Sequence, residues 1–162
     1  MIGMPGCGKT RIGEILAEKT GMGFIDMDAS IEKDENMAVA EIFSKYGEKY
    51  FRELETKKAE ELSDPDNTII STGGGVVLFP GNMEFLKKGG KVFFIERKLS
   101  MIMEAPDMSE RPLLKKNIEE NLKKLYSERI ERYRLYADHT IENNADPESA
   151  ADMILKKGEI EV

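Results

Sequence analysis

Short apolar segments alternate along the chain with longer segments in which apolar side chains recur every three or four residues. The short segments, at residues 1–2, 23–25, 68–71, 91–95 and 140–141, are mostly apolar, as buried parallel strands are. Strands that alternate with helices are typical of right-handed βαβ units. The pattern therefore predicts an α/β fold with a parallel sheet.

The helical spacing predicts a first helix that follows residues 1–8 and ends at Gly21, a suitable C-terminal cap. Further helices are expected around residues 51–62, 118–126 and 147–157, and the last of these opens with a proline in its first turn. Helices of this kind connect successive parallel strands and cover the faces of their sheet.

Two segments lack a regular pattern. Residues 101–114 contain two prolines, mixed charge and weak periodicity, which indicates a mobile excursion. Residues 159–162 are expected to form a frayed tail. The full length of 162 residues is close to a typical domain length of about 150, so we expect one domain over residues 1–162.

The composition excludes several classes of protein. Hydrophobic residues make up 40% of the chain and charged residues 34%, an ordinary globular balance. The net charge of −7 argues against a broad surface for nucleic acid or for an anionic membrane. The longest uncharged stretch, residues 67–83, is broken by glycine and proline, so no membrane-spanning helix is expected. A single cysteine and no secretory signal favour a cytoplasmic protein, and without a motif for a stable partner we expect a monomer.

One motif near the start carries clear chemistry. The pattern G-x-x-x-x-G-K-[ST] is matched in full by Gly3, Met4, Pro5, Gly6, Cys7, Gly8, Lys9 and Thr10. The backbone N–H groups of such a loop bind phosphate oxygens at a helix N-terminus, Lys9 reaches the β and γ phosphates, and Thr10 offers its hydroxyl to Mg²⁺. A glycine-rich turn that only caps the helix explains neither the Lys-Thr pair nor the spacing. We call residues 3–10 the phosphate loop.

Only Met1 and Ile2 precede this loop, whereas a strand that feeds one usually has about five residues. Two hypotheses follow. Either the natural start lies a few residues upstream, or the short segment pairs weakly and lowers the stability of the protein.

Acidic side chains follow the second apolar segment. Asp26 and Asp28 come at the carboxyl end of this predicted strand, where open α/β sheets bind ligands. In strand geometry the two residues face the same side, so one carboxylate could hold a metal-bound water while the other takes a hydroxyl proton. The alternative is that Asp28 caps a helix that begins before Ile31, with Asp26 in solvent.

Two further groups of residues suggest an anionic acceptor. Arg52 and Glu55 are three residues apart, so Glu55 could orient the Arg52 guanidinium toward a substrate carboxylate, although such pairs are often surface decoration. Gly73, Gly74 and Gly75 directly follow an apolar segment and permit close backbone approach to a ligand, whereas a plain tight turn seldom needs three glycines.

The last candidate residues lie in and after the irregular excursion. Arg111 could stabilise a transferring phosphoryl group if this excursion closes as a lid, and the alternative is a solvated loop arginine. Arg129 and Tyr133 lie on the predicted helix that follows. Arg11, Lys9 and the arginines named above would supply local positive potential in an acidic protein.

With these residues in order, nearly the whole chain resembles the shikimate kinase family. The resemblance rests on the phosphate loop together with Asp26-Met27-Asp28, Phe51-Arg52 with Glu55, Gly73-Gly74-Gly75, Arg111-Pro112-Leu113-Leu114, and Arg129 with Tyr133. It implies a three-layer P-loop kinase fold with a five-stranded parallel sheet, in the order 2-3-1-4-5, flanked by helices. It also implies an acceptor-binding region at about residues 26–62 and a lid at about residues 101–117.

The resemblance implies transfer of the ATP γ-phosphoryl group to the 3-hydroxyl of shikimate, which gives shikimate 3-phosphate and ADP for aromatic amino-acid synthesis. By matching position, Asp28 would bind the shikimate hydroxyls and act as the base with help from Gly74, and Arg52 and Arg129 would bind the carboxylate. Thr10 would ligate Mg²⁺ directly and Asp26 through water.

Phosphoryl charge would be stabilised by Lys9 and Arg111, also by matching position. Pro147 matches a residue often found against one face of adenine. Glu104 departs from the family, because many relatives carry there an arginine that packs on the other face.

Two other readings remain open. One is a gluconate-type kinase on the same scaffold, which would not require the set formed by Arg52, the three glycines and Arg129. The other is a nucleotide-binding module that has lost catalysis, and intact Lys9, Thr10, Asp26, Asp28 and Arg111 argue against it.

Overall fold

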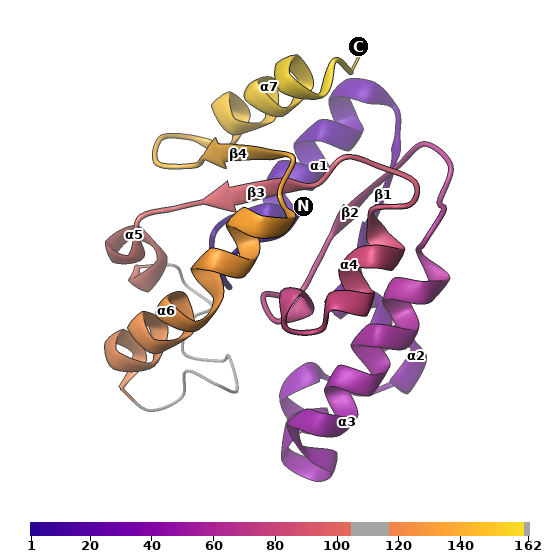
Figure 1. Ribbon diagram of the computed structural model, residues 1–162, viewed down its shortest axis with the longest axis vertical. Helices are drawn as coiled ribbons and strands as arrows, with labels where there is room; N and C mark the ends of the chain where they lie inside the picture. The colour runs from indigo at the N-terminus through magenta and orange to yellow at the C-terminus, as the bar shows by residue number, and fades with distance from the viewer. Residues whose placement is uncertain (105–116, 161–162) are drawn as a thin grey trace.

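The computed structural model describes residues 1–104 and 117–160, drawn in colour in Figure 1. Four strands are assigned: β1 (Gly23–Asp26), β2 (Thr68–Ser71), β3 (Phe93–Glu96) and β4 (His139–Glu142). The helices are α1 (Lys9–Thr20), α2 (Met27–Glu35), α3 (Val39–Glu61), α4 (Pro80–Leu86), α5 (Leu99–Met103), α6 (Ile118–Tyr136) and α7 (Pro147–Gly158), with a 3-10 turn, η1, at Val76–Leu78. None of these helices is long and apolar enough to cross a membrane.

The strands form two parallel pairs, one of β1 with β2 and one of β3 with β4. Met1 and Ile2 run between the pairs. The Met1 nitrogen donates to the Ile70 carbonyl (2.6 Å), and Ile2 exchanges two backbone hydrogen bonds of 2.9 Å with β3. Residues 1–2 thus form an isolated bridge to Phe94 rather than a full strand, and the five-stranded order stays a prediction.

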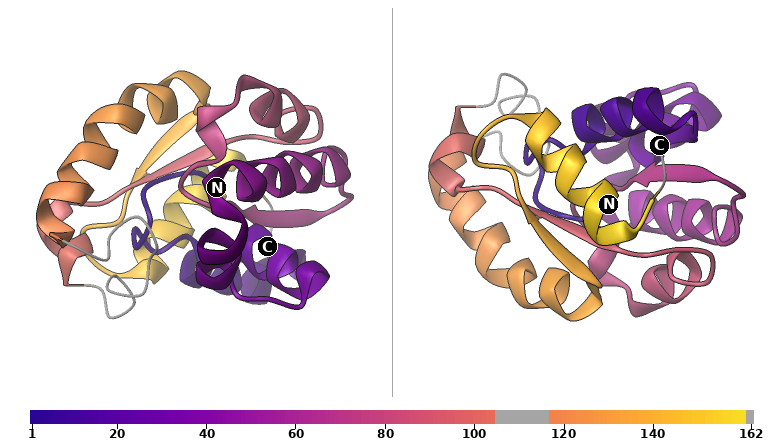
Figure 2. Two further views of the ribbon diagram at one scale, coloured as in Figure 1. Left: turned by 90° about the horizontal axis from the view of Figure 1, so that it is seen from below. Right: turned by 90° about the horizontal axis from the view of Figure 1, so that it is seen from above.

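Consecutive residues of β3 show how helices cover both faces of the strands. Successive side chains of a strand point to opposite sides. The ring of Phe93 lies against Gly158 of α7, whereas the ring of Phe94 stacks on Tyr133 of α6 with centroids 5.2 Å apart. Figure 2 shows the same arrangement, with α1 and α7 on one side of the strands and α4 and α6 on the other. This is the α/β architecture expected from the alternating pattern.

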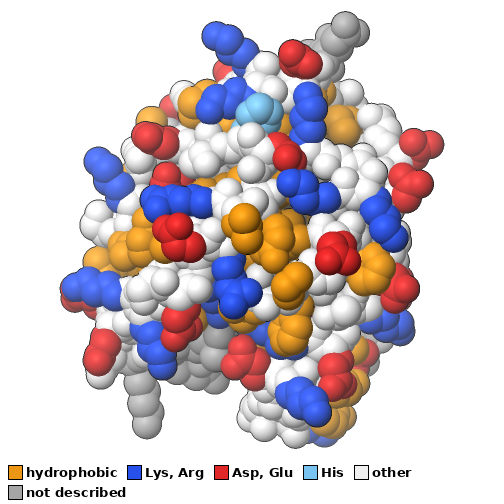
Figure 3. All heavy atoms as spheres, viewed as in Figure 1, with side chains coloured by type: hydrophobic (Ala, Val, Ile, Leu, Met, Phe, Trp, Pro, Cys, Tyr) orange, Lys and Arg blue, Asp and Glu red, His pale blue; other side chains and the backbone are white. Residues whose placement is uncertain are grey.

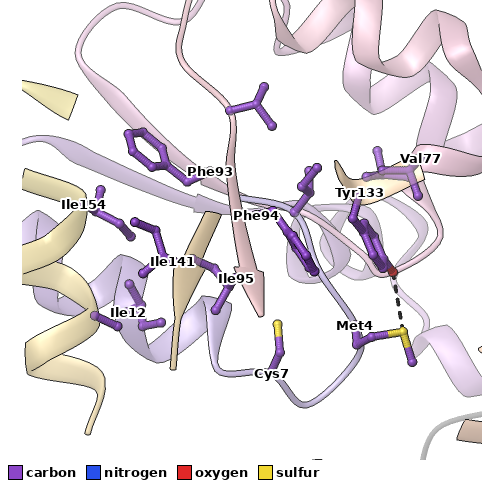
Figure 4. Close-up of a cluster of buried hydrophobic side chains, with 14 of the residues drawn as sticks. Met4, Cys7, Ile12, Val77, Phe93, Phe94, Ile95, Tyr133, Ile141 and Ile154 are labelled. Carbon is purple, nitrogen blue, oxygen red and sulfur yellow. Dashed lines mark hydrogen bonds between the residues drawn. The ribbon is translucent and has the colours of Figure 1, made fainter. Parts of the chain in front are cut away.

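The main core lies between these layers. Ile12 of α1, Ile95 of β3, Ile141 of β4 and Ile154 of α7 are all buried in it, and Figure 4 shows their side chains meeting around β3 and β4. A second, smaller core of Ile31, Ile42 and Phe51 joins α2 to α3. The smaller core positions the two helices that follow the carboxyl end of β1.

Several predicted boundaries are confirmed. Gly21 ends α1 with a left-handed φ of 71°, and its N–H donates to the Ala17 carbonyl at 2.9 Å. Pro147 stands in the first turn of α7, where Asp146 caps the helix by accepting a hydrogen bond from the Ser149 N–H at 2.8 Å.

Other boundaries were wrong. The pattern missed α4, α5 and the first part of α3, and it gave a helix at α2 only as the alternative interpretation of Asp28. Each of these short segments buries only a few side chains and so leaves weak periodicity. α3 is in fact two helical segments joined at Gly47, whose φ of 81° is left-handed. Within the expected excursion, residues 101–103 are helical, and residues 105–116 lie outside the described part of the chain.

The expectation of a frayed tail at residues 159–162 is also wrong for Glu159 and Ile160, the two of these residues that the structure describes. Glu159 adopts a left-handed φ of 55° that caps α7, and the Ile160 N–H donates to the Leu155 carbonyl at 3.0 Å. Ile160 then packs on the main core. This hydrophobic contact after the cap is common at helix C-termini, and it holds the segment in place.

The packing of β3 predicts a large loss of stability for Ile95→Ala. Ile95 is fully buried between the two helical layers, so truncation should leave a cavity and lower the free energy of unfolding by about 2–4 kcal/mol. Urea titration followed by circular dichroism measures this change. Leu135→Ala is the matched control, because Leu135 is 74% exposed and its truncation should change stability by less than about 0.5 kcal/mol.

Candidate active site

The phosphate loop connects Ile2 to α1 and bends through left-handed glycines. Gly6 has a φ of 74° and Gly8 a φ of 99°, conformations that side chains strain to adopt. Gly8 also caps α1, because its carbonyl accepts from the Ile12 N–H at 3.0 Å. The N-terminus of α1 therefore opens directly onto the loop, which is the geometry that phosphate binding requires.

Side chains from inside and outside the loop fix its shape. The Lys9 ammonium donates to the carbonyls of Gly3 and Met4, both at 3.0 Å. Asn143, which follows β4, donates from Nδ2 to the Cys7 carbonyl at 2.8 Å and is 3% exposed. The sequence analysis did not single out Asn143, although its place just after a predicted strand was a usable signal.

Thr10 and Asp26 meet at the mouth of the loop. The Thr10 hydroxyl donates to Asp26 Oδ2 at 2.7 Å, and Asp26 Oδ1 accepts from the Ala29 N–H at 3.2 Å. Asp26 is thus the N-cap of α2, and Asp28 lies in its first turn. The expectation that both carboxylates follow strand geometry is wrong for Asp28, and so is the alternative in which Asp28 is the cap.

A cavity of about 810 Å³ opens over these residues. Its lining joins the phosphate loop to the carboxyl ends of β1 and β2 and includes Lys9, Thr10, Arg11, Asp26, Asp28, Gly73, Gly74 and Arg97. Arg97, one residue beyond β3, is a further cavity residue that the sequence analysis missed. One continuous hollow therefore lies at the carboxyl ends of these strands, where the candidate site is predicted.

Gly73, Gly74 and Gly75 have no room for side chains. A Cβ on Gly73 would lie 2.7 Å from Asp28 Oδ1 and 2.9 Å from Glu55 Oε1, and a Cβ on Gly74 would lie 2.7 Å from the Pro5 ring. A Cβ on Gly75 would overlap the Arg52 guanidinium. None of the three has a positive φ, so close approach rather than turn geometry accounts for the triplet.

Arg52 and Glu55 form a buried ion pair, not a surface one. Arg52 NH1 donates to Glu55 Oε2 at 2.9 Å, and the two side chains are 7% and 0% exposed. Burial raises the pKa of Glu55 to about 7 even though the Arg52 charge opposes this. Arg52 also donates to Glu48, through Nε at 3.3 Å and NH2 at 3.1 Å.

Arg129 of α6 reaches the same cluster from a separate helix. It is 3% exposed, and within the described ranges its Nε has no hydrogen-bond partner. Its charge lowers the pKa of Glu55 and that of Tyr133, while burial raises the pKa of Tyr133 well above its usual value. Arg129 therefore lies near Glu55, and its Nε–H group donates to no described residue.

Not every predicted residue lines the main cavity. Arg52 lines a neighbouring groove of about 650 Å³ instead. Pro147 stands at the start of α7 and Glu104 at the exposed end of α5. Arg111 lies outside the described residues. Acidic and basic side chains are interspersed on the face shown in Figure 3. Lys9 and Arg11 line the cavity and supply local positive charge there.

Metal binding here would depend on few protein ligands. Across residues 1–104 and 117–160, no group of three or more His, Cys, Asp or Glu side chains could hold a metal ion. The hydroxyl of Thr10 and the carboxylate of Asp26 are hard oxygen donors, which suit Mg²⁺, a cation that keeps waters and binds substrate phosphates. The residues present fit Mg²⁺ in the company of a nucleotide.

Comparison with known proteins points to one family. A sequence-family model described as shikimate kinase matches residues 5–159. A shikimate kinase of Clostridium beijerinckii is 44% identical over 145 residues, which cover 90% of this chain and 85% of that protein. The structure of shikimate kinase from Acinetobacter baumannii in complex with shikimate matches with a TM-score of 0.89 at 35% identity, over 96% of this chain and 87% of that one.

A gluconokinase from Sinorhizobium meliloti has a TM-score of 0.54 at 16% identity, with coverage of 98% of this chain and 91% of that one. This likeness concerns the fold alone.

The buried Glu55 carboxyl predicts a pH-dependent stability. Because its folded pKa of about 7 exceeds the unfolded value of 4.5, the folded state holds the proton more tightly, and this group lowers stability as pH rises from about 5 to 8. Glu55→Gln should remove this component, which is worth about 3 kcal/mol. Urea unfolding at a series of pH values measures it. Glu53→Gln, on the exposed side of α3, should keep the wild-type slope, and an unchanged slope in Glu55→Gln would contradict the assignment.

Proposed function

The chain belongs to the shikimate kinase family, and we propose that it transfers the γ-phosphoryl group of ATP to the 3-hydroxyl of shikimate, giving shikimate 3-phosphate and ADP. One observation carries the proposal. A phosphate loop and an aspartate, Asp28, line the same cavity, next to two buried arginines that an anionic acceptor would bind. As part of the same proposal, the protein acts as a monomer in the cytoplasm, where ATP is available.

The nucleotide side follows from the loop. Backbone N–H groups of residues 3–10 and the Lys9 ammonium would bind the β and γ phosphates, with Arg11 beside them. Lys9 would exchange the carbonyls of Gly3 and Met4 for phosphate oxygens. Thr10 would hold Mg²⁺ directly and Asp26 through water. When bound, the ion neutralises charge on the phosphate oxygens.

The acceptor side is organised around Asp28. Its carboxylate would accept the proton of the shikimate 3-hydroxyl as that oxygen attacks the γ phosphorus and the bond to ADP breaks. The backbone at Gly73 leaves room only for a hydrogen at its α carbon, because Asp28 Oδ1 and Glu55 Oε1 lie directly beyond it. Gly73 would thus let the Asp28 carboxylate and the Arg52–Glu55 pair lie close together beside the acceptor.

The acceptor carboxylate would be bound by Arg52 and Arg129. Each side chain is buried, and both charges lower the pKa of Glu55, which therefore lies near both. Glu55 would orient the guanidinium of Arg52, and Gly75 makes room for that guanidinium. Arginine suits this role because its planar fork matches a carboxylate. Roles for Arg111 in stabilising phosphoryl charge and for Pro147 beside adenine rest on the resemblance to the family.

A gluconate-type kinase is less well supported. The gluconokinase of comparable fold shares 16% identity with this chain. An acceptor whose carboxylate is not rigidly placed would also gain little from the two buried arginines near Glu55. A lapsed nucleotide-binding module would have no need of the acceptor cluster at all.

The reaction is tested by ADP release with ATP and Mg²⁺ in a coupled assay. We expect release with shikimate and little above background with gluconate, quinate, nucleoside monophosphates or no acceptor. Equal release with gluconate would favour the alternative kinase. ATP binding without release in the presence of any acceptor would favour the lapsed module.

The proposed base predicts the behaviour of Asp28→Asn. An amide cannot accept the hydroxyl proton, so kcat should fall by about 100-fold or more, while shikimate affinity, measured by calorimetry, should weaken only a few-fold. Turnover within a few-fold of wild type would show that Asp28 is not the base. Asp34→Asn is a suitable control, because Asp34 lies on the same helix as Asp28 but outside the lining of the cavity. Its carboxylate pairs instead with Lys58 at 2.6 Å.

A further inference from the structure

Arg52 donates hydrogen bonds to two glutamates of its own helix, and these differ in burial. Glu55 accepts from NH1 and is fully buried. Glu48 accepts from both Nε and NH2 through a single oxygen and is 47% exposed. Three of the five N–H groups of the guanidinium are therefore already used by carboxylates of the protein.

This arrangement conflicts with the proposed binding of a substrate carboxylate, and the inference below rests on that proposed function. A carboxylate that binds an arginine through two parallel hydrogen bonds needs two neighbouring N–H groups that point the same way. Nε and NH2 form such a pair, and Glu48 Oε1 occupies both. A third carboxylate added beside Glu48 and Glu55 would also crowd three carboxyl groups around Arg52.

Only one of the two glutamates is free to leave. Glu55 lies in the interior with 0% exposure, and its movement would strand a charge there. Glu48 lies at the rim of the groove that Arg52 also lines, and rotation of its side chain would return the carboxylate to water. Its departure would leave the buried Arg52 guanidinium short of a partner only until the acceptor carboxylate took its place.

We propose that Glu48 is a specificity-determining residue that competes with the acceptor carboxylate for Nε and NH2 of Arg52 and is displaced when the acceptor binds. A neutral polyol cannot replace a charge-assisted pair of hydrogen bonds, so it finds Arg52 occupied. An acceptor that carries a carboxylate exchanges one ion pair for another. Glu48 thus favours anionic acceptors, and it lowers the affinity for all of them.

The break in α3 accounts for the position of Glu48. Gly47 interrupts the helix, and Glu48 is the first residue of the second helical segment. From there it reaches Arg52 one turn later by the usual i,i+4 spacing. Acidic residues are also favoured in a first helical turn, so a purely structural role is the competing explanation that the experiment must separate.

The test compares Glu48→Gln with Glu53→Gln. Both substitutions remove one negative charge from the same groove, but Glu48 is the one of the two with a hydrogen bond to Arg52 in the described structure. We expect Glu48→Gln to lower the Kd and KM for shikimate by about two- to fivefold, with the KM for ATP unchanged. Glu53→Gln should shift the shikimate Kd by less than twofold. Calorimetry and steady-state kinetics supply these values.

The methyl ester of shikimate isolates the carboxylate. Because the ester has no charge with which to displace Glu48, its Kd should not improve in Glu48→Gln as that of shikimate does. An equal gain for the ester and the acid would overturn the proposal in favour of a general opening of the groove. A weaker shikimate Kd in Glu48→Gln would overturn it in favour of a residue that merely holds Arg52 in place.

Arg52→Ala separates this inference from the proposed function. If wild-type protein phosphorylates shikimate and Arg52→Ala weakens shikimate binding, the role of Arg52 holds, and the Glu48 result alone decides the competition. If Arg52→Ala leaves the shikimate Kd unchanged, the binding role of Arg52 fails and the competition fails with it, while the phosphoryl transfer itself still stands.

Discussion

The buried ion pair between Arg52 and Glu55 is the interaction on which the arrangement of the site depends. A charged group this deep is tolerated only beside a partner, so neither side chain can move far without the other. The pair fills the space beside Gly73 and Gly75, which is why these positions have no side chain. Through the triplet, α3 also fixes the backbone that follows β2, and Gly74 in turn touches Pro5 of the phosphate loop.

This cluster costs stability in exchange for binding. Burial of Glu55 raises its pKa to about 7, a sign that the folded state holds its charge at an energetic penalty. A hydrophobic pair of the same size would often be more stable. The polar cluster is therefore better explained by a ligand that completes it. A carboxylate between Arg52 and Arg129 would add negative charge opposite two cations and use donors such as Arg129 Nε, which has no partner among the described side chains.

The sequence allowed the fold class and the local arrangement of several candidate-site residues to be predicted, because those features depend on local patterns. The phosphate loop, the glycine triplet and the Arg52–Glu55 pair each occupy a few consecutive positions. Asn143 and Arg97 were missed for the opposite reason. Asn143 matters only because the end of β4 meets Cys7, and Arg97 because the end of β3 lies beside the cavity. Glu48 is four residues before Arg52, a spacing that the sequence does show, but i,i+4 pairs are too common on helix surfaces to single one out. The prediction that Asp28 follows strand geometry was wrong because the strand ends two residues earlier, at Asp26. There the Ala29 N–H donates to the Asp26 carboxylate and caps the start of α2.

Tyr133 links the two halves of the site. Its hydroxyl donates to the Gly74 carbonyl at 2.5 Å and contacts Met4 Sδ at 3.9 Å, so one side chain of α6 touches both the glycine triplet and the phosphate loop. Its ring is held in turn by Phe94 of β3. Because Arg129 lies one helical turn before Tyr133, this anchoring directs the Arg129 guanidinium toward Glu55. The position proposed for an acceptor carboxylate, relative to the phosphate loop, would thus be set by side chains packed in the core.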